Sequence, residues 1–116
     1  MLELLTDVER RTLDAYVELL RTQLGEHLVA VRVFGSVARG ESWPIGMPIR
    51  SDLDVLVLVA APLDAEAQQD LVDATLSLFL ESGRQISPQF RTSEQHAAST
   101  SRAAIDAEAI EVWPCR

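Results

Sequence analysis

The sequence of 116 residues has one cysteine, no lysine and no long apolar run. Cys115 has no second cysteine to pair with, so an internal disulfide is excluded, and a zinc site built from cysteines lacks its ligands. The longest apolar run extends from Val55 to Pro62, far short of the roughly 20 residues that span a membrane. We therefore expect a cytoplasmic protein without a secretory signal or a membrane partner.

Positive charge is scarce as well. The ten basic residues are all arginine and are scattered, whereas 18 residues are acidic, which gives a formal net charge of -8. Binding to nucleic acid depends on clustered cations that displace counterions from the phosphates. The composition therefore argues against DNA or RNA as the main partner.

The remaining composition is that of a globular protein, with 47% hydrophobic and 24% charged residues. The length suits one domain with its own core, so we expect residues 1–116 to form a single domain. The spacing of apolar residues predicts helices and strands in alternation, typical of an α/β fold. The expected helices are 6–24, 37–41, 62–82 and 102–108, and the expected strands are 28–34, 51–59, 84–91 and 109–113.

A Gly-Ser pair, Gly35-Ser36, directly follows the first predicted strand. Glycine lets a ligand approach the backbone closely, and a serine at a helix N-terminus can offer its hydroxyl and free N–H groups to a phosphate. On its own such a pair is usually only a turn. Its significance depends on the second motif.

The second motif is an Asp-x-Asp pair, Asp52 and Asp54, at the start of the next predicted strand, where both side chains fall on one face. Two like charges side by side repel unless a cation lies between them, and such hard oxygen ligands suit Mg²⁺. The alternative is a solvated polar edge without a ligand. Together, a phosphate cradle and paired carboxylates are the layout needed for in-line attack on an α-phosphate with pyrophosphate leaving.

Gly-Ser-x-x-x-Gly followed by Ser-Asp-x-Asp on a strand resembles the nucleotidyltransferases of the DNA polymerase beta superfamily, most closely their minimal bacterial and archaeal members. The motifs cover residues 28–60, and the order of elements covers most of the chain. The resemblance implies a small mixed sheet flanked by helices, like the palm of polymerase beta. It also implies that Asp52 and Asp54 bind Mg²⁺ and serve catalysis. The implied nucleotide-binding residues are Gly35, Ser36, Arg39 and Ser51.

The resemblance implies a Mg²⁺-dependent enzyme that transfers a nucleoside monophosphate from ATP or another nucleoside triphosphate to a hydroxyl of a protein or small molecule. Active members supply a third carboxylate from the next strand, but the segment from Arg84 to Arg91 has none, and Ser87 and Gln89 occupy the expected positions. Glu94, in the following loop, is the candidate substitute. The alternative is therefore a binding or antitoxin-like module that masks a partner such as a helical HEPN toxin.

A third hypothesis is a plain α/β interaction domain that binds no nucleotide. In every case so small a domain leaves little surface for an acceptor, so a second copy or a partner chain is expected to complete the cleft. We assign His27 and His96 structural places, at a helix-to-strand junction and in a polar loop. Trp43, and less so Trp113, could stack on a nucleobase.

Overall fold

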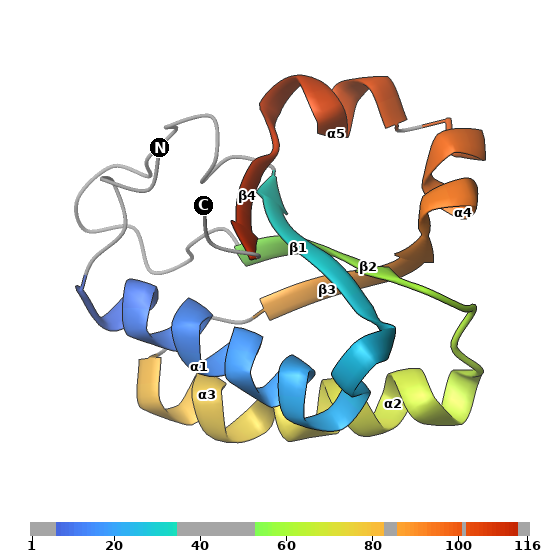
Figure 1. Ribbon diagram of the computed structural model, residues 1–116. Coiled ribbons are helices and arrows are strands. Elements are labelled where there is room, and N and C mark those ends of the chain that lie inside the picture. The colour runs from blue at the N-terminus through green and yellow to red at the C-terminus, as the bar shows by residue number, and fades with distance from the viewer. Residues whose placement is uncertain (1–6, 35–52, 83–85, 101, 114–116) are drawn as a thin grey trace.

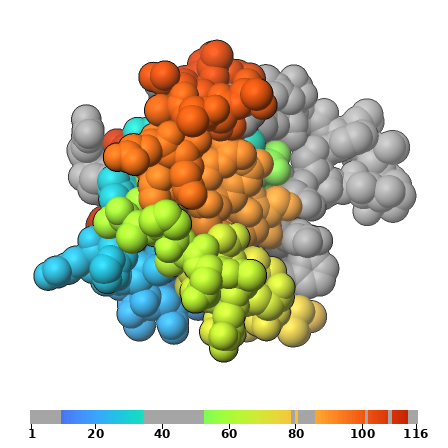
Figure 2. Space-filling model, turned by 90° about the vertical axis from the view of Figure 1, so that its right-hand side faces the viewer, coloured from blue at the N-terminus to red at the C-terminus, as the bar shows by residue number. Residues whose placement is uncertain are grey.

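The computed structural model describes residues 7–34, 53–82, 86–100 and 102–113. These residues form one sheet with helices on both faces (Figure 1). Figure 2 shows α2 and α3 in the lower part of the molecule and α4 and α5 in the upper part. The helices are α1 (Asp7–Leu24), α2 (Ala65–Ala74), α3 (Leu76–Ser82), α4 (Ser93–Ala98) and α5 (Arg102–Glu108); the strands are β1 (Leu28–Phe34), β2 (Leu53–Val59), β3 (Ile86–Thr92) and β4 (Ile110–Trp113).

The sheet order is β3-β2-β1-β4. The two most apolar segments of the sequence, β1 and β2, pair antiparallel at its centre, because strands buried on both faces need apolar residues on both. Strand β4 adds to β1 antiparallel, and β3 adds to β2 parallel. The mixed sheet flanked by helices is thus confirmed, and Pro88 is tolerated because β3 is an edge strand.

The alternation of β2 creates two core layers. Leu53, Val55, Val57 and Val59 face the larger cluster, which includes residues of α1, α2 and α3. Leu56 and Leu58 face a smaller cluster that includes Ile105 of α5. Asp54 shares this second face by its position in the strand.

Helix α1 covers the first face with Leu13, Tyr16 and Leu20, which are almost fully buried. It ends at Leu24 as predicted, and Gly25, at φ 56°, adopts the left-handed conformation that glycine tolerates best. A short 3-10 turn, Gly25–His27, then leads into β1, which confirms the junction expected for His27.

The single helix expected over 62–82 is two helices, α2 and α3, separated at Thr75. Both the backbone N–H and the hydroxyl of Thr75 donate hydrogen bonds to the carbonyl of Val72, at 3.0 Å and 2.6 Å. Such back-bonding competes with the regular i to i-4 pattern and bends helices. The predicted start is confirmed, since Asp64 caps α2 by accepting a 2.7 Å bond from the Ala67 N–H.

The polar loop expected around His96 is a helix, α4. Its start is fixed by a capping box, in which the Thr92 hydroxyl accepts from the Gln95 N–H at 3.0 Å and the Gln95 side chain accepts from the Thr92 N–H at 2.9 Å. The following helix, α5, agrees with the prediction for 102–108. None of the helices that the structure describes has the length and apolar character to span a membrane.

Candidate active site

Most of the predicted site lies outside the described residues. Asp54 lies within them, at the second position of β2, and its side chain is half-buried. Asp54 is therefore the predicted site residue whose surroundings the structure describes. The predicted residues outside the described part are Gly35, Ser36, Arg39, Ser51 and Asp52.

Asp54 lies between two neighbouring strands. On one side it pairs with Phe34, the last residue of β1, and on the other with Ser87 of β3. Residues paired across a sheet project to the same face, so the side chains of all three belong to the face with Leu56 and Leu58. The Gly35-Ser36 motif begins directly after Phe34, and the Asp-x-Asp motif ends at Asp54. Because Phe34 pairs with Asp54, the end of β1 and the start of β2 lie side by side at the same end of the sheet.

The position beside Asp54 on β3 holds a hydroxyl rather than a carboxylate. Ser87 is level with Asp54, and Gln89 is level with Leu56. The predicted strand over 84–91 thus lies directly beside β2, and β3 itself contains no Asp or Glu. The side-chain oxygen Oε1 of Gln89 is buried without a hydrogen-bond partner.

Glu94 does not replace the missing carboxylate. It lies exposed in the first turn of α4, beyond Thr92, whereas Asp54 is level with Ser87 near the other end of β3. Thr92 is five steps along the extended strand from Ser87, a span of about 16 Å. The expectation that Glu94 could serve from the next loop is therefore wrong.

A cation that the sequence analysis missed lies on the same face as Asp54. Arg32 of β1 pairs with Leu56, which places it diagonally across from Asp54 at about 7–8 Å. Its guanidinium is 4.0 Å from Asp106 and 3.8 Å from Glu111, so both ion pairs are loose. The signal in the sequence was a single charge within an otherwise apolar central strand.

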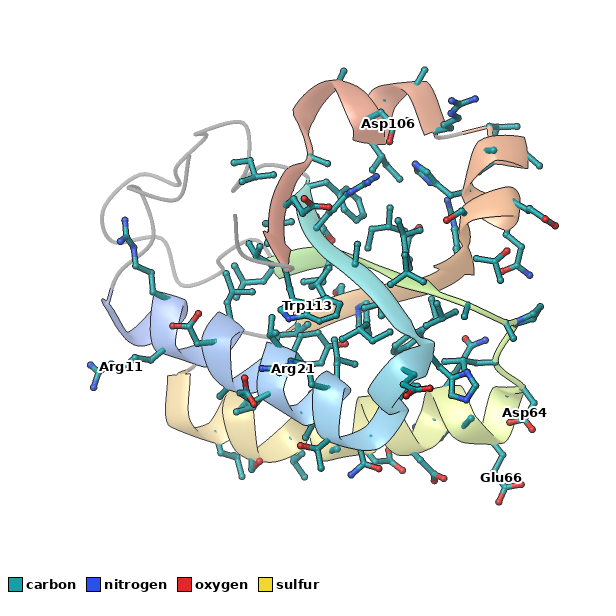
Figure 3. All side chains as sticks on the ribbon, viewed as in Figure 1. Arg11, Arg21, Asp64, Glu66, Asp106 and Trp113 are labelled. Carbon is teal, nitrogen blue, oxygen red and sulfur yellow. The ribbon has the colours of Figure 1, made fainter. Side chains whose placement is uncertain are left out.

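Asp106 gathers several charged groups where α4 and α5 cover this face. Asp106 lies on α5 in the upper part of Figure 3. The Nε2 atom of His96, which is buried, lies 2.7 Å from Oδ1 of Asp106, and Nε of Arg102 lies 3.5 Å from its other oxygen. The hydrogen bond from His96, with its charge and that of Arg102, holds the pKa of the Asp106 carboxyl below its usual value. His96 thus makes this contact from a helix rather than from the polar loop that we expected.

Trp113 lies on the opposite face from Asp54. It pairs with Val31, a member of the larger core cluster, and the Arg21 guanidinium lies 5.9 Å from its ring centre (Figure 3). The ring therefore cannot stack on a base held at Asp54. Trp43 lies outside the described residues.

Within the described segments, no group of three or more His, Cys, Asp or Glu residues could hold a metal ion.

The proteins that this chain resembles are solved structures. Comparison with protein-family models and with curated proteins gave no match. A solved structure assigned as a minimal nucleotidyltransferase is 32% identical, with a TM-score of 0.58, and the match covers 90% of this chain and 95% of that one. This identity over almost two whole chains shows more than a shared fold.

Two more distant matches come from toxin–antitoxin pairs. One is MntA-HepT with two aspartate-to-glutamate substitutions two positions apart, at a TM-score of 0.62 and 20% identity over 89% of this chain and 73% of that one. The other is a tri-AMPylated Shewanella oneidensis HEPN toxin in complex with an MNT antitoxin, at a TM-score of 0.58 and 17% identity over 91% of this chain and 72% of that one. At such identities these matches show the fold alone.

Proposed function

Because this chain belongs to the minimal nucleotidyltransferases, we propose that it transfers a nucleoside monophosphate from ATP or another nucleoside triphosphate to a hydroxyl. In this proposal Asp52 and Asp54 hold Mg²⁺, and the triphosphate binds at Gly35, Ser36, Arg39 and Ser51. The reaction takes place in the cytoplasm. The acceptor is a hydroxyl of a protein, and a second chain completes its binding site.

The position of Asp54 supports this proposal most directly. A half-buried carboxylate at the start of a central strand lies beside the end of β1, from which the Gly35-Ser36 motif continues. Carboxylate and hydroxyl oxygens are donors that suit Mg²⁺, and Asp54 and Ser87 supply one of each at the same level of the sheet. The donors present therefore fit the proposed ion.

The chemistry is a substitution at the α-phosphorus. A bond forms between the acceptor oxygen and the α-phosphorus, and the acceptor hydroxyl gives up its proton to water. The bond from that phosphorus to the bridging oxygen of the β-phosphate breaks, and pyrophosphate leaves with the electron pair. Mg²⁺ supplies charge neutralisation for the transferring group. Asp52 and Asp54 orient the triphosphate, and Arg32 adds positive charge to the face on which Asp54 lies.

The identity of the acceptor follows by analogy with the similar structures. One of them contains an AMPylated HEPN toxin with an MNT antitoxin. We extend this to the present chain as the proposal that its acceptor is a side-chain hydroxyl of a helical toxin partner. The scattered arginines and the net charge of -8 continue to argue against nucleic acid in that role.

A second candidate function is binding without efficient transfer, in which the chain masks its partner. The observation that favours it is Ser87, because the hydroxyl beside Asp54 can neither carry the charge of a third carboxylate nor take a proton from the acceptor at neutral pH. Loss of that group lowers the rate by orders of magnitude while leaving most of the triphosphate contacts.

Pyrophosphate release from ATP, measured with the partner protein present as acceptor and with and without Mg²⁺, distinguishes the two candidates. Transfer predicts release that requires Mg²⁺ and is lost in Asp52→Asn and Asp54→Asn, while Asp14→Asn, an exposed carboxylate on α1, behaves as wild type. Binding without transfer predicts no release from a wild type that still binds Mg²⁺–ATP. Release that survives both site substitutions would contradict the proposed site.

A further inference from the structure

Three large apolar side chains are exposed along one side of α2 and α3. Val72, Leu76 and Leu80 are 39%, 60% and 73% exposed. They recur every fourth residue, and Thr75 between the two helices keeps helical backbone angles, φ -77° and ψ -10°. The three side chains therefore form a row about 12 Å long along α2 and α3. Leu71, Thr75 and Leu78 form the buried row that faces the core, so the exposed row does not contribute to it.

Acidic residues accompany this exposed row. Between residues 51 and 83 the sequence has no arginine, lysine or histidine, while α2 carries Glu66, Asp70 and Asp73. None of these three carboxylates forms a salt bridge within the described part of the chain. Glu66 and the capping Asp64 extend from the lower edge of the molecule (Figure 3). We call Val72, Leu76 and Leu80 with these three carboxylates the α2–α3 face.

We propose that the α2–α3 face docks a basic amphipathic helix of a partner protein. A row of side chains spaced by four residues is the ridge that packs into the groove of another helix. The carboxylates beside it complement lysine or arginine flanking the apolar stripe of that helix. A contiguous exposed apolar row of this kind marks an interaction site more often than a stable free surface.

A second copy of the chain is disfavoured by its charge. In a symmetric dimer the same patch meets itself, so the two sets of carboxylates would lie together. Each copy also has a net charge of -8, which opposes association. A basic partner removes both penalties.

This docking surface lies beyond the proposed nucleotide site and does not depend on it. Leu71 and Leu78, on the buried side of α2 and α3, pack with Val55 and Val57 of β2. Asp54 alternates with these residues and therefore projects to the other face of the sheet. A partner bound on α2 and α3 would thus leave the face of Asp54 open to nucleotide.

The test uses the whole chain and two synthetic peptides of about five helical turns. Both peptides have leucines at every third or fourth position; one carries lysine on its flanks and the other glutamate. Fluorescence anisotropy should show binding of the lysine peptide only, and binding that weakens as salt increases. Equal binding of both peptides, or binding of neither, would contradict the proposal.

Variants locate the surface. Leu76→Ser and Leu80→Ser should each weaken binding of the lysine peptide about tenfold, while Val29→Ser, an exposed apolar residue on β1, should leave it unchanged. Glu66→Gln with Asp70→Asn should reduce both the affinity and its dependence on salt, with Glu26→Gln as the matched control. Binding that resists the leucine substitutions would place the peptide elsewhere and overturn the proposal.

Two further measurements separate this inference from its alternatives. Sedimentation of the wild type should show a monomer; a dimer that Leu80→Ser dissociates would identify a second copy as the occupant and refute the basic partner. Calorimetry should show that Leu76→Ser and Leu80→Ser do not change ATP binding. If the wild type binds the peptide but not ATP, the nucleotide proposal fails and the docking surface stands.

Discussion

Ser87 of β3 lies level with Asp54 of β2 in the parallel pair of the sheet. Parallel neighbours that share a level also share a face, so the Ser87 side chain projects to the same face as Asp54. The resemblance to active nucleotidyltransferases implies a third carboxylate on this strand, and the strand pairing shows that Ser87 is the residue level with Asp54. A substitution at Ser87 can therefore test whether a missing carboxylate limits the rate of nucleotide transfer.

Ser87→Asp should raise the rate of Mg²⁺-dependent pyrophosphate release. The new carboxylate would add a metal ligand and a proton acceptor beside Asp54, and a group of this kind contributes about a hundredfold or more in rate. The measurement is the steady-state rate at saturating ATP with the acceptor present. Ser93→Asp, at the exposed start of α4 beyond the other end of β3, is the matched control; an equal gain there would show that Ser87 does not limit the reaction.

The central strands were predictable because their pattern has one interpretation. In β2, alternate residues fill two separate core clusters, and in β1 only Arg32 interrupts the apolar run. Such segments are stable only when both faces are covered, which requires a place in the middle of a sheet. Because this strand could be predicted, alternation along it could place the Asp54 side chain on a definite face of the sheet.

Three predictions from the sequence were wrong: the loop around His96, the unbroken helix over 62–82 and the role of Glu94. The first two depend on local hydrogen bonds, and the third depends on the direction in which β3 runs. Helix α4 is short and polar, so its apolar pattern is too weak to detect, although Thr92 and Gln95 carry the capping signature. The break at Thr75 depends on a hydroxyl that bonds to its own helix. The position of Glu94 required the parallel pairing of β3, which is set by contacts distant in sequence.

Tyr16→Phe should leave the fold intact and raise the free energy of unfolding. Tyr16 is fully buried, its hydroxyl has no hydrogen-bond partner, and burial raises the pKa of its phenol. Removing an unsatisfied buried hydroxyl should contribute about 1 kcal/mol. Urea denaturation measures the change, and a loss of stability would mean that the hydroxyl has a partner in solution.

Leu20→Ala provides the contrast on the same helix. Its side chain is fully buried in the larger core cluster, and its removal leaves a cavity. The expected loss of stability is about 2–5 kcal/mol in the same denaturation experiment. A loss below about 1 kcal/mol would contradict the packing of α1 on the sheet.

Asp106→Asn should destabilise the fold at neutral pH and have no effect at low pH. Because the hydrogen bond from His96 lowers the pKa of Asp106 in the folded state, the charged carboxylate stabilises the protein above the ordinary value of 3.8, and this contribution is lost as the pH falls through the folded pKa. Melting temperatures of wild type and Asp106→Asn should therefore differ at neutral pH and converge as the pH falls below 3.8 and through the folded pKa of Asp106. Asp14→Asn is the exposed control, and curves that stay parallel would contradict the role of Asp106.

Calorimetric titration of ATP into wild type and Asp54→Asn, each with and without Mg²⁺, tests whether Asp54 belongs to a Mg²⁺–nucleotide site. We expect the wild type to bind ATP only in the presence of Mg²⁺. Asp54→Asn, which keeps the size of the side chain but removes its charge, should lose this binding. If Asp54→Asn binds Mg²⁺–ATP as tightly as the wild type, the proposed site is wrong.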